Sequence, residues 1–181
     1  EYEEGGEWEV ETEKGGEVEL EQFWLQKSFS RAFNIRAGHI VVPVGLNNSH
    51  HEPLNFFTVY RPEGENTILP STWHQTGVSL WGHYRNFKYE LQFLEGLDAM
   101  QFDRDGWIKK GPHSAFEFSP ASKYAMAARL DWYAMPGMRL GVSGYYGHSI
   151  NNTLMNDANE KLKGAVTIGS VDFTLNKYNW I

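Results

Sequence analysis

The strongest constraint on the fold is the stretch "GVSLWGHYRNFKYELQFLEG" at 77–96, in which apolar and polar residues alternate. The alternation breaks once, at Arg85-Asn86, and resumes directly afterwards. Because successive side chains of a strand point to opposite faces, the pattern predicts a β-hairpin with an apolar, aromatic face and a polar, charged face. The apolar face of such a hairpin contacts either a protein core or lipid.

Similar alternation covers much of the remaining chain. Glutamates occupy alternate positions between Glu7 and Glu21, with a turn at Lys14-Gly15-Gly16. Further strands are expected at "QFWLQKSF", "FNIRAGHIVVPVG", "YAMAARLDWY", "MRLGVSGYYGHS" and "AVTIGSVDFTL". The sequence therefore predicts an all-β, antiparallel fold in which about eight strands are visible.

Short and long connections alternate between these strands. The short ones are Ser30-Arg31-Ala32, Arg85-Asn86 and Met135-Pro136-Gly137, and the long ones are 46–75, 97–122 and 150–163. One end of the sheet then carries tight turns and the other carries long loops, which is typical of outer-membrane β-barrels. Soluble sandwiches and lipocalin-type barrels show the same asymmetry less regularly.

Composition supports strands that cross a membrane but does not require them. Aromatic residues make up 15% of the 181 residues, and the chain has no cysteine. No apolar run approaches the roughly 18 residues of a transmembrane helix, which excludes a helical membrane protein. Aromatic residues near both ends of the strands are typical of interfacial girdles, although they also fit packing in a core or under loops.

The formal net charge of −7 is concentrated at the start of the chain. Residues 1–21 hold ten glutamates and a single lysine, and the remainder is close to balanced. This asymmetry gives no indication of a nucleic-acid partner. The start shows no basic segment followed by an apolar one, so the chain is not exported, or it is a mature chain or an internal segment.

The chain resembles the porin O/P-type family of Gram-negative outer-membrane porins, some of them phosphate-selective. Its sequence is most similar to the Bacteroidetes-type members. The resemblance covers nearly the whole chain and rests on "VELEQFWLQKSF", "FNIRAGHIVVPVGLNNSHHEP" and "YRPEGENTILPSTWHQTGVSLWG". It implies a transmembrane barrel of about sixteen or more strands, often trimeric. Eight strands alone close into a barrel filled by its own side chains, so residues 1–181 look like a segment of a larger barrel domain.

In such a barrel the charged face of each strand points into the lumen, where charges tune ion selectivity. The candidate pore-lining residues are Lys88, Glu90, Arg129, Asp131, Arg139 and Arg36. The basic members favour anions such as phosphate, whereas the Glu7–Glu21 stripe on the same side would favour cations or neutralise the arginines. The alternative is an ordinary solvated face with scattered ion pairs, each of which contributes little.

The resemblance also implies a role for the 46–75 loop, because a long loop in such porins often folds into the barrel and narrows the channel. His50, His51, Glu52 and Arg61 are then candidates for the constriction. The first three also suggest a metal site, with His74 or His39 as a further ligand. Adjacent side chains in a strand diverge, and only a loop conformation could bring His50 and His51 together, so we expect loop packing and hydrogen bonding in place of a metal. No catalytic constellation or phosphate-binding glycine-rich loop is found, and we expect neither enzymatic activity nor a cofactor.

These features predict a porin in the outer membrane of a Gram-negative bacterium. It would allow passive, weakly charge-selective diffusion of small hydrophilic solutes or ions. Its expected partners are the lipid bilayer, these solutes and copies of itself in a homotrimer, with no nucleic acid. Two alternatives stay open. One is a soluble all-β carbohydrate- or ligand-binding domain with exposed Trp73, Trp81 and Trp107. The other is a non-channel structural barrel in a surface complex.

Overall fold

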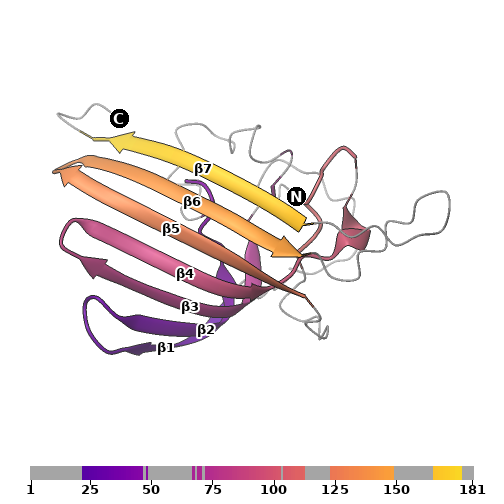
Figure 1. Ribbon diagram of the computed structural model, residues 1–181, viewed down its shortest axis with the longest axis horizontal. Coiled ribbons are helices and arrows are strands. Elements are labelled where there is room, and N and C mark those ends of the chain that lie inside the picture. Colours follow the sequence, from indigo (N-terminus) through magenta and orange to yellow (C-terminus); the bar gives the residue numbers. More distant parts are fainter. Residues whose placement is uncertain are drawn as a thin grey trace, which may run out of the picture.

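A computed structural model of the chain contains one antiparallel sheet of seven strands in the part of the chain that the structure describes. That part comprises residues 22–46, 48, 67, 69–70, 72–102, 104–112, 123–148 and 165–176. The strands follow one another in space as they do in sequence (Figure 1). They are β1 (Phe23–Ser28), β2 (Asn34–Val41), β3 (His74–Tyr84), β4 (Phe87–Glu95), β5 (Tyr124–Met135), β6 (Met138–His148) and β7 (Ala165–Leu175). A short 3-10 helix, η3 (Ala99–Gln101), follows β4.

The two ends of the sheet differ as the sequence predicts. Tight turns join β1 to β2, β3 to β4 and β5 to β6 at one end, and the longer connections lie at the other (Figure 1). The first long connection is displaced from the predicted 46–75. Val41 pairs with His74 and Ile40 with Gln75, so β2 ends at Val41 and β3 begins at His74. Backbone pairing extends β3 into a segment whose polar side chains hide the strand pattern.

One face of the sheet is apolar and exposed. Directly paired residues of antiparallel strands share a face, so the register assigns each side chain to a side. From Tyr124 to Trp132 of β5 the alternation is complete, with exposed Met126 and Leu130 alternating with buried Ala127, Arg129 and Asp131. The exposed large side chains on this face include Val78, Leu91, Phe93, Met126, Leu130, Trp132, Val142, Tyr146, Val171 and Phe173.

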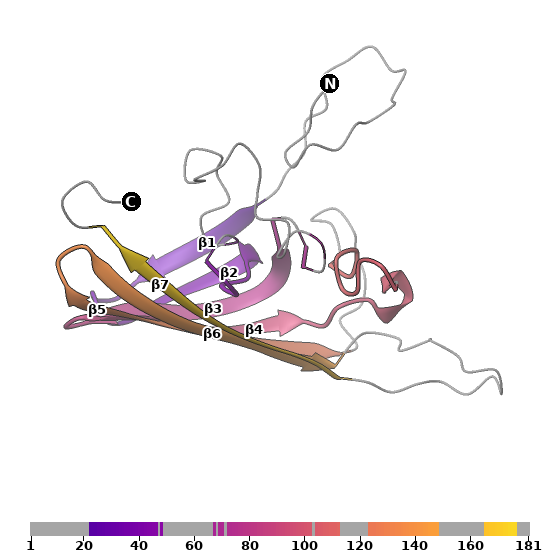
Figure 2. The same ribbon diagram turned by 90° about the horizontal axis from the view of Figure 1, so that it is seen from above.

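The opposite face is concave and largely polar. Its buried polar side chains are Asn34, Gln75, Ser79, Gln92, Arg129, Asp131 and Ser143. Figure 2 shows the sheet curling so that β1 and β2 rise towards the side on which the described parts of the connections after β2 and β4 lie. These described parts therefore cover some of the concave face, whereas no described segment covers the convex face.

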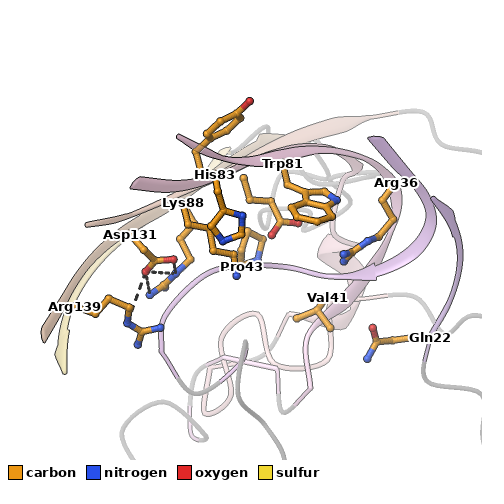
Figure 3. Close-up of a pocket in the computed structure, with 12 residues that line it drawn as sticks. Gln22, Arg36, Val41, Pro43, Trp81, His83, Lys88, Asp131 and Arg139 are labelled. Carbon is orange, nitrogen blue, oxygen red and sulfur yellow. Dashed lines mark hydrogen bonds and ion pairs between the residues drawn. The ribbon is translucent and has the colours of Figure 1, made fainter. Parts of the chain in front are cut away.

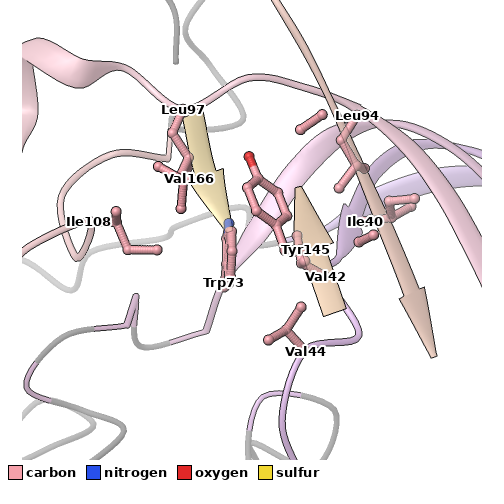
Figure 4. Close-up of a cluster of buried hydrophobic side chains, with 11 residues drawn as sticks. Ile40, Val42, Val44, Trp73, Leu94, Leu97, Ile108, Tyr145 and Val166 are labelled. Carbon is pink, nitrogen blue, oxygen red and sulfur yellow. The ribbon is translucent and has the colours of Figure 1, made fainter. Parts of the chain in front are cut away.

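The apolar core lies on the concave side, at the end with the long connections (Figure 4). Side chains of β2, β4, β5, β6 and β7 meet side chains of the connections there. The cluster consists of Ile40, Val42, Val44, Trp73, Leu94, Leu97, Ile108, Ala125, Ala127, Tyr145 and Val166. Trp73 is only 1% exposed, so the expectation of a free Trp73 that stacks on sugars is wrong. Its ring packs against Tyr145 at a centroid distance of 4.8 Å, because the chain turns inward before β3 begins.

The described sheet is open. β1 pairs only with β2 and β7 only with β6 among the described strands. The acidic strand expected between Glu7 and Glu21 lies outside the described residues, so about eight strands were predicted and seven are described. Closure into a barrel, and the number of strands that closure requires, remain predictions. Within the described residues, no helix combines the length and apolarity that crossing a membrane requires.

Candidate functional site: a charged cavity on the concave face

A cavity of about 440 Å³ opens on the concave face (Figure 3). Five strands, β2 to β6, form its wall, and the segment that follows β2 forms part of the opposite side. The lining residues are Gln22, Arg36, Val41, Pro43, Trp81, His83, Lys88, Tyr89, Glu90, Arg129, Asp131 and Arg139. All six residues named from the sequence as pore-lining are in this set, although β2 and β6 are separated by three strands. That they line a pore remains a prediction.

Arg129 is the centre of the charge network on β5. Its guanidinium donates to the carboxylates of Asp131 at 2.8 Å and Asp172 at 2.8 Å, and its side chain is 6% exposed. Arg139 approaches the same two carboxylates at 3.9 and 3.4 Å. Two cations therefore face two anions in a buried setting, where each charge needs a partner to offset its lost hydration.

Gly141 makes this network geometrically feasible. Asp131, Gly141 and Asp172 are cross-strand neighbours in one row of β5, β6 and β7. A Cβ atom on Gly141 would collide with Nη2 of Arg129 and would lie 2.6 Å from Oδ1 of Asp172. Because Gly141 has no side chain, the guanidinium lies over the middle strand and reaches the carboxylate on the far one.

The same network fixes the chain segment that enters the concave face after β2. Nη1 of Arg129 donates to the Gly45 carbonyl at 2.8 Å, and the Gly45 amide donates to Oγ of Ser143 at 3.0 Å. The Gln92 amide donates to the Val41 carbonyl at 2.8 Å. Both backbone groups of Gly45 are thus bonded to the sheet wall, so this segment is fixed inside the curve of the sheet.

Asn48 joins the two stems of the first long connection. Its Nδ2 donates to the carbonyls of Val42 and Trp73 at 2.6 and 3.0 Å, and its Oδ1 accepts from the Trp73 amide at 2.7 Å. The Val42 amide also donates to the Trp73 carbonyl at 2.9 Å. The inward path of Val42–Leu46 is therefore set at both of its ends, by the stem and by Arg129.

A second group of charged residues lies on β2, β3 and β4. The Arg36 guanidinium carbon lies 4.7 Å from the Trp24 ring centroid and 5.7 Å from that of Trp81. Glu90 accepts hydrogen bonds from Ser79 and Gln92 through Oε1, at 2.7 and 2.8 Å. Lys88 forms no ion pair with any residue that the structure describes. Among the described residues, the positive charges of Arg36 and Lys88 in this part of the wall therefore have no ion-pair partner.

Some residues of this site were missed from the sequence. Asp172 completes the Arg129 network, Trp24 contacts Arg36, and Ser143 holds Gly45. Trp81, which also contacts Arg36, was named from the sequence only for the soluble alternative. Each occupies a polar-face position of its strand, so the alternation alone could have included them. The inward turn at Gly45 has no comparable signal, because it depends on contacts with β5 and β6.

The remaining predictions on the long loop cannot be compared with the structure. His50, His51, Glu52 and Arg61 lie outside the described residues. The rings of His39 and His74, considered as further metal ligands, have centroids 5.9 Å apart. Within the described ranges, no three His, Cys, Asp or Glu side chains form a group that could hold a metal ion.

The comparisons with known proteins found a similar protein whose name states no function. The chain is 30% identical over 135 residues to an uncharacterized protein of Aquifex aeolicus (strain VF5), which covers 74% of this chain and 31% of that protein. The chain therefore spans about a third of the relative's length. No protein-family model and no solved structure matches the chain.

Proposed function

We propose that the chain is part of an outer-membrane β-barrel channel of the porin O/P type, through which small hydrophilic solutes or ions diffuse passively. The observation that carries the proposal is the inverted polarity of the sheet. Leu130 on the convex face is 47% exposed, whereas the adjacent Arg129 and Asp131 on the concave face are 7% and 2% exposed. A soluble protein buries the opposite set, because apolar side chains leave water and charges stay in it.

The extent of the apolar face supports lipid as its environment. Across β4 to β7 in the described chain, the convex positions between the outermost aromatics carry no charged residue. Soluble monomers rarely expose a contiguous apolar patch larger than a few hundred Å². Lipid removes this cost, and strands can cross a bilayer when a closed barrel pairs all their backbone groups.

Aromatic residues on the convex face form two belts. Phe87 stacks on Trp132 near the tight turns, and Phe93 stacks on Tyr124 near the long connections, at centroid distances of 6.4 and 5.0 Å. From Tyr124 to Trp132 the extended strand spans about 27 Å, at about 3.4 Å per residue. The nine residues from Tyr124 to Trp132 match the roughly 9–11 residues of a tilted transmembrane β-strand, and an aromatic girdle at each edge is typical of such barrels.

The concave face supports a lumen of restricted width. The cavity and its charges lie where the inside of a barrel would be, and the segment around Gly45 is bonded to the wall there. Loop constrictions and rings of charge are the usual means by which a pore selects solutes. Further strands must pair with β1 and β7 to close the barrel, and we propose that they belong to a longer polypeptide that forms a homotrimer in a Gram-negative outer membrane.

Planar-bilayer recordings of the full-length protein test this proposal. We expect stepwise conductance, together with a folded band on gels that shifts on heating. A protein that is soluble and folded without detergent would overturn the proposal in favour of a soluble binding domain.

One observation favours the structural-barrel alternative. The apolar cluster around Trp73 and Tyr145 fills part of the concave face and would obstruct a lumen. Protein that inserts into the bilayer but gives no conductance steps would support a non-channel barrel and overturn the channel. Conductance steps that persist after the protein is purified to homogeneity would exclude the non-channel barrel.

A further inference from the structure

The half of the cavity formed by β2, β3 and β4 differs from the half that holds Arg129. Here an indole, a carboxylate and two cations without an ion-pair partner among the described residues share one wall. We propose that this half is a binding subsite for a sugar that carries a carboxylate, a solute of the uronic-acid class. The inference deepens the proposed function, on which it relies only for the route by which the solute reaches the cavity.

Trp81 provides a surface for the ring of the sugar. It lines the cavity from β3, with His83 edge-on to its indole at a centroid distance of 6.3 Å. Val41 and Pro43 contribute apolar surface from β2 and the segment that follows it. A pyranose has a flat face of C–H groups and a rim of hydroxyls, and apolar walls with a few placed polar groups bind such amphipathic solutes.

Arg36 provides a partner for the carboxylate. Contacts with Trp24 and Trp81 hold its guanidinium, and its Nε donates to Oε1 of Gln26 at 3.2 Å. Its two terminal nitrogens donate to no residue that the structure describes. A planar guanidinium with two free N–H groups matches a carboxylate in a bidentate pair, and stacking on aromatic rings reduces the flexibility that binding would otherwise remove.

Glu90 and Lys88 suit the hydroxyl groups of the same ring. Glu90 is directly opposite Trp81 in the β3–β4 register, and its hydrogen bonds with Ser79 and Gln92 fix the carboxylate. Lys88 is two residues away on the same face and has no ion-pair partner in the described chain. A fixed carboxylate accepts hydrogen bonds from sugar hydroxyls, and an ammonium donates hydrogen bonds to them. Glu90 and Lys88 together can therefore pair with the donor and the acceptor of a hydroxyl group.

The charge balance selects an acidic sugar over a neutral one. Arg129 and Arg139 in the other half already contact Asp131 and Asp172. Arg36 and Lys88 have no carboxylate partner among the described residues, so an anionic group of the solute would supply the missing charge. A simple inorganic anion would use these cations but would gain nothing from Trp81.

Titration of the full-length protein in detergent tests the inference, with intrinsic tryptophan fluorescence or calorimetry as the readout. The probes are galacturonate, galactose and inorganic phosphate, of which the first two share one ring. We expect galacturonate to bind at least about tenfold more tightly than galactose, a difference of about 1.4 kcal/mol. Arg36→Lys and Arg36→Gln should remove this preference, and Trp81→Ala should weaken the binding of both sugars.

Trp107→Ala is the matched control, because Trp107 is an exposed indole outside the cavity lining and should leave binding unchanged. Equal affinity for galacturonate and galactose would overturn the inference. So would phosphate that binds as tightly as galacturonate, which would indicate a general anion site. If Trp81→Ala fails to fold, the Arg36→Lys result decides. Conductance of the same preparation separates the two proposals, since a conducting protein that binds no sugar overturns this inference alone.

Discussion

On the convex face of the sheet the exposed side chains are apolar, whereas on the concave face charged side chains are buried. On β7, Val171 is 73% exposed on the convex face, while Asp172, the next residue, is held in the buried network with Arg129. The hydrophobic effect in water would place these side chains the other way round. The difference is the one expected if, as we propose, lipid surrounds the convex face and water fills the space within the curve. Substitutions that change one face and leave the other intact test this difference.

The largest effect is expected from the concave network. Arg129→Gln leaves Asp131 and Asp172 buried without their main cation and removes a bond to the Gly45 carbonyl. Loss of one partner of a buried ion pair costs about 3–5 kcal/mol. We expect a loss of this size in the free energy of unfolding, measured by urea titration of the protein refolded in lipid. Conductance of the folded fraction should rise, because the inward segment is released.

A stable Arg129→Gln variant with unchanged conductance would show that Arg129 holds neither the network nor the segment. Gln26→Ala is a control on the same face. It removes a polar side chain of the exposed strand β1, which forms only exposed hydrogen bonds with Arg36 and Ser28 in the described chain, and it should cost less than about 1 kcal/mol.

The next effect tests lipid contact directly, with two adjacent residues. Val171→Lys puts a charge on the convex face of β7, in the row shared with Leu130 and Val142. A lysine at the midplane of a bilayer costs about 2–4 kcal/mol in a transmembrane barrel. Ser170→Lys adds the same charge on the concave face and should cost much less. The folded fraction after refolding into vesicles measures both.

If Val171→Lys folds as well as Ser170→Lys, the convex face meets water. This result would favour the soluble domain, in which an exposed valine is replaced by lysine at little cost.

Sequence alternation predicted the side that most strand residues take, because the strand period is two and the turn within each hairpin is short. It therefore brought Arg36, Lys88 and Arg139 to one face although they are far apart in the chain. It could not predict that Arg129 reaches Asp172 across Gly141, since that contact depends on the curvature of the sheet and on the missing side chain. The inward turn at Gly45 and the burial of Trp73 likewise depend on packing between distant strands.

Alanine substitutions at two glycines, one on each face, test how closely side chains are packed there. Gly141→Ala would place a methyl group against Arg129 and the Asp172 carboxylate, whereas a Cβ atom on Gly169 meets nothing within 4 Å on the convex side. We expect Gly141→Ala to cost about 1–3 kcal/mol, as overpacking does. Gly169→Ala should be neutral or should stabilise the strand by up to about 1 kcal/mol. Urea titration in lipid gives both values, and equal costs would mean that the network around Gly141 can move away.

The smallest change in stability, and the most direct test of a lumen, comes from reversing one charge on each face. Lys88 lines the cavity without an ion pair in the described chain, and Lys27 is an exposed residue of β1 on the convex side. A unit charge acts on an ion 5 Å away with about 0.8 kcal/mol in water. Lys88→Glu changes the charge by two units and should lower the anion-to-cation permeability ratio several-fold, measured as the reversal potential across a salt gradient. Lys27→Glu makes the same change outside the lumen and should leave that ratio unchanged. If both variants shift the reversal potential equally, the cavity is not on the conduction path, and the concave face would serve to hold the inward segment in place.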